Sequence, residues 1–155
     1  MISPEILRRY PFFSPFDEAE LREIAMFADE TSVEESTELF KENDEADTLY
    51  LILEGGIDLF YKSEEEYHPK KSKEFYVGSI NPGEIFAFSA IIEPYKLTAT
   101  ARVSKTSKLV EIDAKKLRAL IFANPALGFS ALQQVIKMLY QRLADTRVQL
   151  AAALD

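Results

Sequence analysis

The order of apolar and polar positions divides the chain into helical segments at both ends and strands between them. Within residues 1–30, Ser3 precedes Pro4 and a short apolar run, which predicts a capped first helix. Asp17 and Glu20 have the spacing of a capping box, and the apolar residues after them recur at helical spacing, so a second helix is expected there. We expect both helices to pack on the rest of the domain rather than to carry a site.

Residues 31–112 have the pattern of short strands separated by turns. The segment 48–53 is an apolar run rich in strand-forming residues, and the segment 57–61 alternates apolar and polar positions. Gly55 and Gly56 stand between them, a combination that predicts a β-hairpin.

The second half of this region continues in the same way. A polar stretch at 62–73 is expected to form a longer hairpin loop, and a strand at 75–80 ends at the turn signal 81–84. Two further short strands are predicted at 98–103 and 108–112. Turn signals every ~8–12 residues favour a compact β-sandwich or β-roll.

Residues 113–155 return to a helical pattern. Asp113 is expected to cap a short helix that ends at Asn124, and Pro125 opens a helix that runs to about Leu154. Apolar residues recur on this long helix at spacings of four and three, the a/d pattern of paired helices. The members of this apolar face are Leu132, Ile136, Leu139, Leu143 and Leu150, and Thr146 shares it.

This apolar face has two interpretations. Its first half could pack on the β-roll of its own chain. Beyond Leu143, however, the helix is expected to extend past so small a roll, which favours a partner helix. We therefore predict a homodimer paired through this helix, because symmetric dimers are the commonest oligomers.

The composition narrows the possible classes of protein. The 155 residues fit one domain, and with 47% apolar residues the chain has enough material for one core. The absence of cysteine excludes disulfides, thiolate metal sites and cysteine nucleophiles. A net charge of −8 argues against a direct nucleic-acid partner. No apolar run approaches the ~20 residues of a membrane span and no signal peptide is recognisable at the start, so a cytoplasmic protein without membrane contact is expected.

Catalytic signatures are lacking. His68 is the only histidine, and it stands beside Pro69 in a charged segment, where a solvated loop residue is expected rather than a general base. One histidine also excludes a cupin-type metal site. Glu64, Glu65 and Glu66 belong to the same polar stretch, where solvation explains them better than acid–base chemistry. No phosphate-binding glycine loop, nucleophile elbow or zinc-protease motif occurs, so an enzyme is not predicted.

Three motifs make the chain resemble the cyclic nucleotide-binding domain family. They are the buried strand ending in Glu-Gly at 49–55, the Ile-Asn-Pro-Gly-Glu-Ile-Phe segment at 80–86, and the Phe-Lys-Glu-Asn-Asp turn at 40–44. In the last, Asn43 stands where glycine is usual, and asparagine tolerates the left-handed conformation better than most residues. The resemblance covers the chain from Phe12 to Leu150.

The resemblance implies an α+β fold that is mainly β. A jelly-roll-like β-roll, or double-stranded β-helix, would be flanked by N-terminal helices and a long C-terminal helix, all in one domain of residues 1–155. It also implies a non-catalytic regulatory or sensor module. The family's transcription factors continue into a helix-turn-helix domain, and the sequence up to Asp155 holds none, so these residues are not expected to contact DNA.

The family's ligand cassette reads roughly Phe-Gly-Glu-Leu-Ala-Leu, followed by Pro-Arg-Thr/Ser-Ala. The glutamate would bind the ribose 2′-hydroxyl and the arginine the cyclic phosphate. In this chain Phe88 replaces the glutamate and Leu97 the arginine, and only Lys96 beside it offers positive charge. The residues expected at the pocket are Phe86, Ala87, Phe88, Ser89, Lys96, Leu97, Thr98 and, by resemblance to the family's dimer helix, Thr146.

Two functions therefore stay open. The first is a sensor that binds a small-molecule effector, a cyclic nucleotide held weakly or a different ligand, and signals through the long dimer helix to an unknown output protein. The second is a ligand-free dimerisation or protein-interaction domain whose pocket is plugged by Phe86 and Phe88. A resemblance of fold does not carry function, so the resemblance alone assigns no cofactor to this chain.

Overall fold

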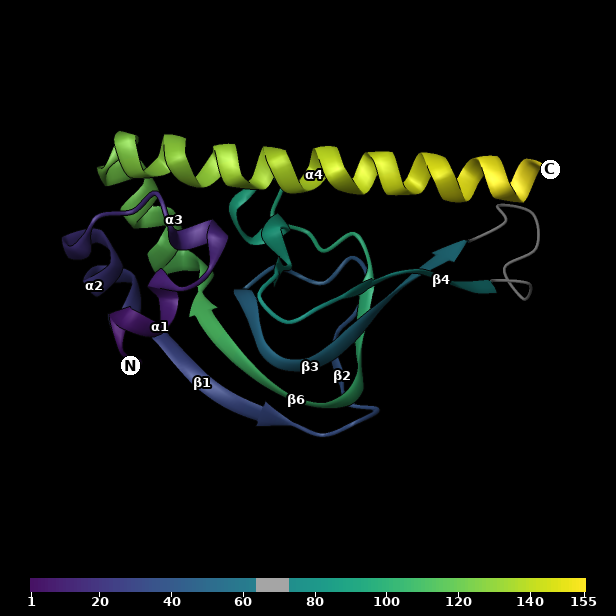
Figure 1. Cartoon of the computed structure of the whole chain (residues 1–155), viewed down its shortest axis with the longest axis horizontal. Helices are drawn as coiled ribbons and strands as arrows, with labels where there is room; N and C mark the ends of the chain where they lie inside the picture. The colour runs from purple at the N-terminus through teal and green to yellow at the C-terminus, as the bar shows by residue number, and fades with distance from the viewer. Residues whose placement is uncertain (64–72) are drawn as a thin grey trace.

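The computed structural model describes residues 1–63 and 73–155, and Figure 1 shows a β-roll with one long helix running along it. The helices are α1 (Pro4–Arg8), α2 (Glu18–Met26), α3 (Ala114–Ala123) and α4 (Pro125–Leu154), with the short 3-10 helices η1 (Pro11–Phe13) and η3 (Phe88–Ile91). The strands are β1 (Ala28–Val33), β2 (Glu38–Phe40), β3 (Thr48–Ser63), β4 (Lys73–Ile80), β5 (Ile85–Phe86) and β6 (Thr100–Asp113). The predicted fold class is confirmed.

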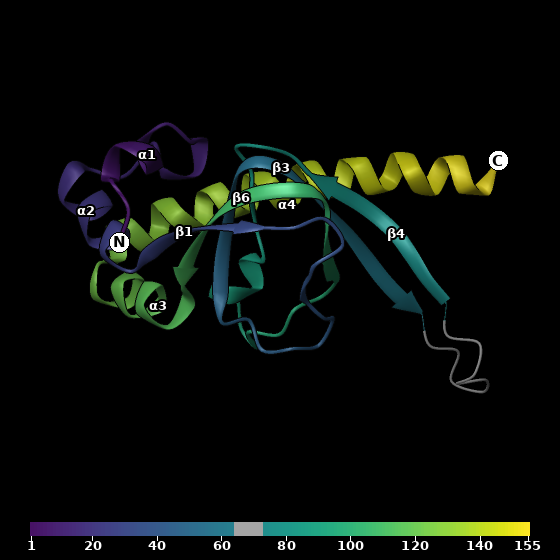
Figure 2. The same cartoon turned by 90° about the horizontal axis from the view of Figure 1, so that it is seen from below.

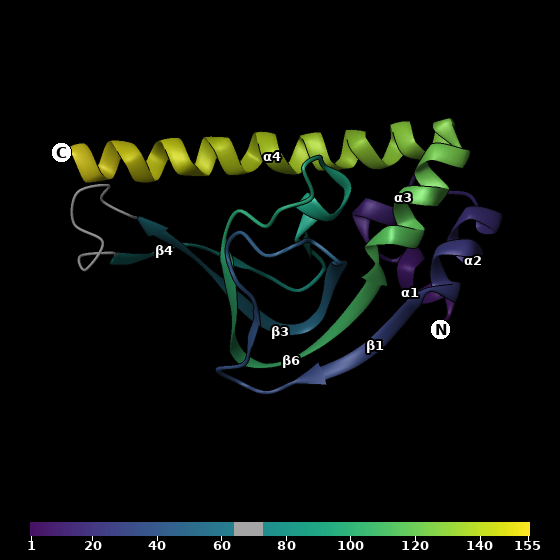
Figure 3. The same ribbon diagram turned by 180° about the vertical axis from the view of Figure 1, so that it is seen from behind.

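All strand pairs are antiparallel, with the order β1-β6-β3-β4 and with β2 on β6 and β5 on β3. The sheet curls on itself because β3 and β6 are long and bend together (Figures 1 and 3). Helices α1, α2 and α3 gather at one end of the roll, whereas α4 runs from that end past the sheet towards β4 (Figure 2). Within the described part of the chain no helix is both long and apolar enough to cross a membrane.

The hairpin predicted at Gly55 and Gly56 is wrong. β3 continues through both glycines, and its register against β6 shifts there, so the pair forms a bulge that bends the strand. Gly55 adopts φ +104°, and Ser107 of β6 lies so close that a Cβ at Gly55 would come within 2.0 Å of its hydroxyl oxygen. That hydroxyl accepts a hydrogen bond from the Gly56 N–H at 3.1 Å. Only the partner strand shows that the glycines bend the chain instead of reversing it.

The two strands predicted at 98–103 and 108–112 are also wrong as separate elements. They belong to one strand, β6, which stays paired with β3 through the intervening polar residues, including Lys105 opposite Gly56. The predicted strand at 75–80 is part of β4. β3 extends to Ser63, so most of the polar loop predicted at 62–73, with His68 in it, lies outside the described residues.

The predicted helix starts are confirmed by their capping hydrogen bonds. The Asp17 carboxylate accepts from the Glu20 N–H at 2.8 Å, and the Glu20 carboxylate accepts from the Asp17 N–H at 3.1 Å. Ser3 caps α1, and the Asp113 carboxylate caps α3 by accepting from the Lys116 N–H. These residues lie within three positions of the groups they bind, which explains why the sequence alone revealed them.

The apolar residues predicted to share one face of α4 are not buried against the β-roll, although Thr146, at the edge of that face, lines a cavity between α4 and the sheet. Residues of another face, Leu127, Ala131 and Val135, are buried against the rest of the chain. The predicted face is exposed along its whole length, from 40% at Leu132 to 62% at Ile136. The interpretation in which its first half packs on its own chain is therefore wrong. The other exposed members of this face are Leu139, Leu143 and Leu150.

Candidate functional site

The predicted cassette lies between β5 and β6, at the side of the roll that faces α4. Its first turn is set by Ala87, which adopts φ 63° and ψ 36° and precedes η3. The left-handed region favours glycine, the residue that the family cassette carries at this position. The turn geometry is therefore kept although the residue has changed. Ser89 lies in η3 and is half-buried.

Two of the predicted pocket residues, Phe86 and Leu97, are buried in the core, although Leu97 also lines a cavity together with Lys96 and Thr98. Phe86 is 1% exposed, and its ring stacks on Tyr50 with centroids 4.9 Å apart. Leu97 is 5% exposed, and its backbone is fixed to the 40–44 turn. Its N–H donates to the Asp44 carbonyl at 2.9 Å, and its carbonyl accepts from the Asn43 N–H at 2.8 Å. Asn43 itself adopts φ 73°, which confirms the expected left-handed conformation.

Lys96 does not replace the missing arginine of the cassette. Its ammonium group lies 3.8 Å from the Glu45 carboxylate, and its side chain is 51% exposed. The positive charge next to Leu97 is therefore directed to the surface in this structure.

A cleft of about 520 Å³ separates the sheet from the C-terminal half of α4. Tyr61 and Tyr76 contribute to its sheet wall, and Thr98 lies in its lining just before β6. Arg142 and Thr146 line it from α4. Among the described residues, no cluster of three or more histidine, aspartate or glutamate side chains is arranged to hold a metal ion.

Arg142 lines this cleft but was not among the pocket residues predicted from the sequence, and neither were Tyr61 and Tyr76. The guanidinium carbon of Arg142 lies 5.0 Å from the centroid of the Phe88 ring. Burial lowers the pKa of the guanidinium below its ordinary value, and the carboxylates of Glu84 and Asp145 only partly oppose this. The available signal was spacing: Arg142 lies four positions before Thr146, so both share one helix face. The Thr146 hydroxyl donates to the Arg142 carbonyl at 2.8 Å.

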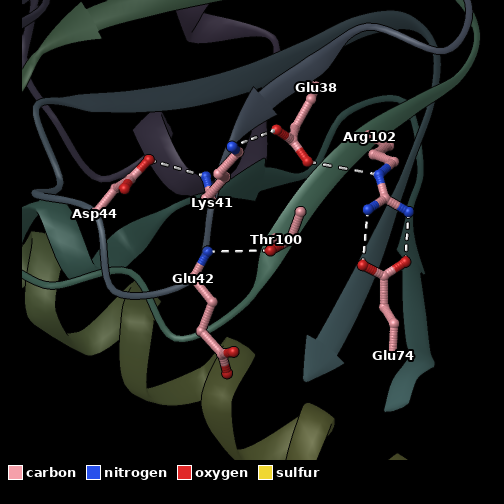
Figure 4. Close-up of polar contacts among 7 residues, drawn as sticks. All are labelled: Glu38, Lys41, Glu42, Asp44, Glu74, Thr100 and Arg102. Carbon is pink, nitrogen blue, oxygen red and sulfur yellow. Dashed lines mark hydrogen bonds and ion pairs between the residues drawn. The ribbon is translucent and has the colours of Figure 1, made fainter. Parts of the chain in front are cut away.

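A polar network holds the sheet side of the site in shape (Figure 4). Arg102 of β6 binds Glu74 of β4 with two hydrogen bonds, one of them 2.7 Å long, and lies 3.6 Å from Glu38 of β2. These hydrogen bonds hold the pKa of Glu74 below its usual value. The Thr100 hydroxyl accepts from the Glu42 N–H at 3.0 Å, which fixes the 40–44 turn to β6. The sheet wall is thus cross-linked, whereas α4 beyond Val135 has no fully buried residue.

The fold and the cleft define a β-roll sensor domain, and comparison with known proteins identifies its family. The family model of the cyclic nucleotide-binding domain matches residues 30–124. A crystal structure of a candidate cyclic nucleotide-binding protein from Geobacter metallireducens GS-15 is 38% identical, with a TM-score of 0.79, and the match covers 92% of this chain and 99% of that one. The chain belongs to the cyclic nucleotide-binding domain family.

Two more distant matches are consistent with this family assignment. A cyclic nucleotide-binding domain from Methylobacillus flagellatus KT has the same fold at 20% identity, with a TM-score of 0.75 over 95% of this chain and 79% of that one. A candidate potassium channel protein of Rhodopseudomonas palustris is 22% identical over 128 residues, or 83% of this chain. The match covers only 29% of that relative's length.

Proposed function

We propose that this chain is a non-catalytic sensor domain in which a small-molecule effector binds in the cleft between the β-roll and α4. The observation that carries the proposal is the cleft itself, whose volume of about 520 Å³ falls within the usual range of small-molecule sites. One of its walls is a cross-linked sheet and the other is a helix with few buried contacts at that level. A ligand that contacts both walls would change the position of α4.

The effector is proposed to be something other than a well-bound cyclic nucleotide. The lost glutamate and arginine correspond to two charged hydrogen bonds, together worth about 3–6 kcal/mol. At about 1.4 kcal/mol per factor of ten, a micromolar site would become millimolar or weaker. The structure supports this estimate, because Leu97 is buried in the core and Lys96 is paired with Glu45.

Titration calorimetry with cyclic AMP and cyclic GMP tests this part of the proposal. We expect dissociation constants in the millimolar range or no detectable heat. The matched variant is Phe88→Glu, which places a carboxylate where the family carries one and which should tighten cyclic AMP binding about tenfold. Micromolar binding by the unmodified chain would contradict the proposal of an altered ligand.

The response is proposed to pass through pairing of α4 with a second copy. The exposed apolar residues on this helix favour that arrangement, since Leu143 is 49% and Leu150 57% exposed. Leu143→Asp should convert a dimer to a monomer, as measured by light scattering after size-exclusion chromatography. Gln133→Asp, an exposed polar position on the same helix, is the control and should leave the mass unchanged. A Leu143→Asp protein with the mass of the unmodified chain would argue against this interface.

A ligand-free dimerisation domain is the second candidate. It is favoured by the contact between Phe88 and Arg142, which occupies the space next to the cassette. The Phe86 ring is buried and stacks on Tyr50, and it is not part of the lining of the cleft. This candidate predicts that the dimer assembles normally while no small molecule binds in the cleft.

A further inference from the structure

We infer that the cleft takes a small organic anion whose carboxylate or phosphate group pairs with Arg142 of α4. This inference rests on the proposed function and specifies the chemistry of its effector. The anion-binding group would then stand on the helical wall of the site, opposite the sheet and outside the cassette.

The position of Arg142 supports a role in binding. Its guanidinium lies against the Phe88 ring, so one face of the planar group is covered. An arginine offers five N–H donors in a fixed fork, and the edge of the fork stays available when a face is stacked. Among the described residues, the Arg142 side chain takes part in no ion pair and no hydrogen bond, and no fully buried polar side-chain atom lacks a partner, so its nitrogen atoms are not fully enclosed. Arg142 lines the cleft.

The charged groups around the cleft are few, and their charges are balanced. Arg142 and Asp145 are the charged groups of the described lining, and the Asp145 carboxylate already accepts a hydrogen bond from the Gln141 amide at 3.0 Å. An adjoining cavity of about 490 Å³ shares Tyr61 and Thr98 with the cleft and adds two lysines and one glutamate: Lys62, Lys96 and Glu42. Because Lys96 is paired with Glu45, the remaining cations, Arg142 and Lys62, are balanced by Asp145 and Glu42. An anion would therefore be attracted by Arg142 itself rather than by a net positive charge of the lining.

Partial burial of Arg142 strengthens its ion pair with an anionic ligand. The electrostatic attraction between a partly buried cation and an anion is stronger than the attraction between the same ions in open water, because the local dielectric constant is lower. The remaining wall is apolar or aromatic, with Leu59, Tyr61 and Tyr76 on the sheet side. This combination suits a ligand with one anionic group and a planar or apolar body.

Two matched pairs of probes test the inference by calorimetry on the whole chain. Adenosine 5′-monophosphate is compared with adenosine, and indole-3-acetate with indole-3-acetamide, so that each pair differs in its anionic group. We expect at least one anion to bind about tenfold to a hundredfold more tightly than its neutral partner. A preference confined to the first pair identifies a phosphate ligand, and one confined to the second identifies a carboxylate.

Variants at one position show whether Arg142 causes the preference. Arg142→Met should abolish the difference within each pair while leaving the binding of the neutral member within about threefold, and Arg142→Lys should keep part of it. Lys137→Met on the exposed side of α4 is the control and should keep the whole difference. Circular dichroism on heating checks that each variant folds.

Three results would overturn the inference. Equal binding of charged and neutral probes would refute it while leaving the cleft as a ligand site. A preference that survives in Arg142→Met would place the anion elsewhere. Absence of binding by all four probes would argue against both the inference and the sensor function.

Discussion

Arg118 of α3 connects the cassette to the C-terminal helices, and its removal should loosen the cassette. Its Nη1 group donates to the Ala90 carbonyl of η3 at 2.7 Å. The same guanidinium lies 4.1 Å from the centroid of the Tyr95 ring. Both contacted residues belong to the segment between β5 and β6, so one side chain holds two points of the cassette against α3.

The expected magnitude follows from these two contacts. A hydrogen bond from a charged donor is worth about 1.5–3 kcal/mol, and an exposed cation–π contact about 0.5–1 kcal/mol. Arg118 is half-buried, so solvent screening places the total near the lower end, at about 2 kcal/mol. This corresponds to about a thirtyfold increase in local opening.

Amide hydrogen exchange followed by NMR measures that opening directly. Three amides report on the segment, because the N–H groups of Ala90, Ile92 and Tyr95 bind carbonyls within it. In Arg118→Ala they should exchange about thirtyfold faster, while amides in the centre of β3 and β6 keep their rates. Arg118→Lys keeps a charged donor but loses the planar stack, so an intermediate rate is expected.

Two results would refute this reasoning. Unchanged exchange of all three amides in Arg118→Ala would show that the cassette is held by its own turn and by apolar packing. Equally faster amide exchange in β3 and β6 would show that Arg118 stabilises the whole domain rather than the contact between the cassette and α3.

The remaining predictions concern stability. Gly55→Ala should lower the free energy of unfolding in urea by about 2–6 kcal/mol, because it combines backbone strain at φ +104° with displacement of the Ser107 hydroxyl that accepts from the Gly56 N–H. The control is Gly78→Ala, whose Cβ would have no heavy atom within 4 Å, and it should lower the free energy of unfolding clearly less. Equal losses in the two variants would exclude the close approach of Ser107 as the cause. Burial, and to a smaller extent the charge of Asp29, raises the pKa of Glu111 in the folded chain. The protonated form of Glu111 is therefore favoured on folding, and the stability that this provides is lost as the pH rises through the raised pKa. Glu111→Gln should therefore raise the free energy of unfolding at pH 7, by less than about 1 kcal/mol, and should leave it unchanged at a pH below 4.5, the ordinary pKa of glutamate. A lower free energy of unfolding at pH 7 would contradict the sign of this prediction.

Parts of the fold and site that depend on neighbouring residues could be predicted from the sequence. The caps at Ser3, Asp17 and Asp113 and the left-handed turn at Asn43 are of this kind, because each involves groups within a few positions. The order of elements and the family motifs then indicated the β-roll. The position of the cassette followed, although its side chains did not, since Phe86 and Leu97 are core residues.

Tertiary structure decided the features that require two distant segments. Gly55 and Gly56 could form a hairpin or a bulge, and the choice depends on Ser107, about fifty positions away on β6. The a/d spacing on α4 showed an apolar face but could not show which face meets the sheet, because the helix also carries Leu127, Ala131 and Val135 on another side.

The sequence by itself therefore indicated the cyclic nucleotide-binding domain family and predicted a cassette without the family's glutamate and arginine. Only the folded chain shows that Arg142 comes from α4 to lie against Phe88 at the edge of the cleft. The physical reason is that local propensity and periodicity act within an element, whereas a site between a sheet and a helix depends on how the two pack.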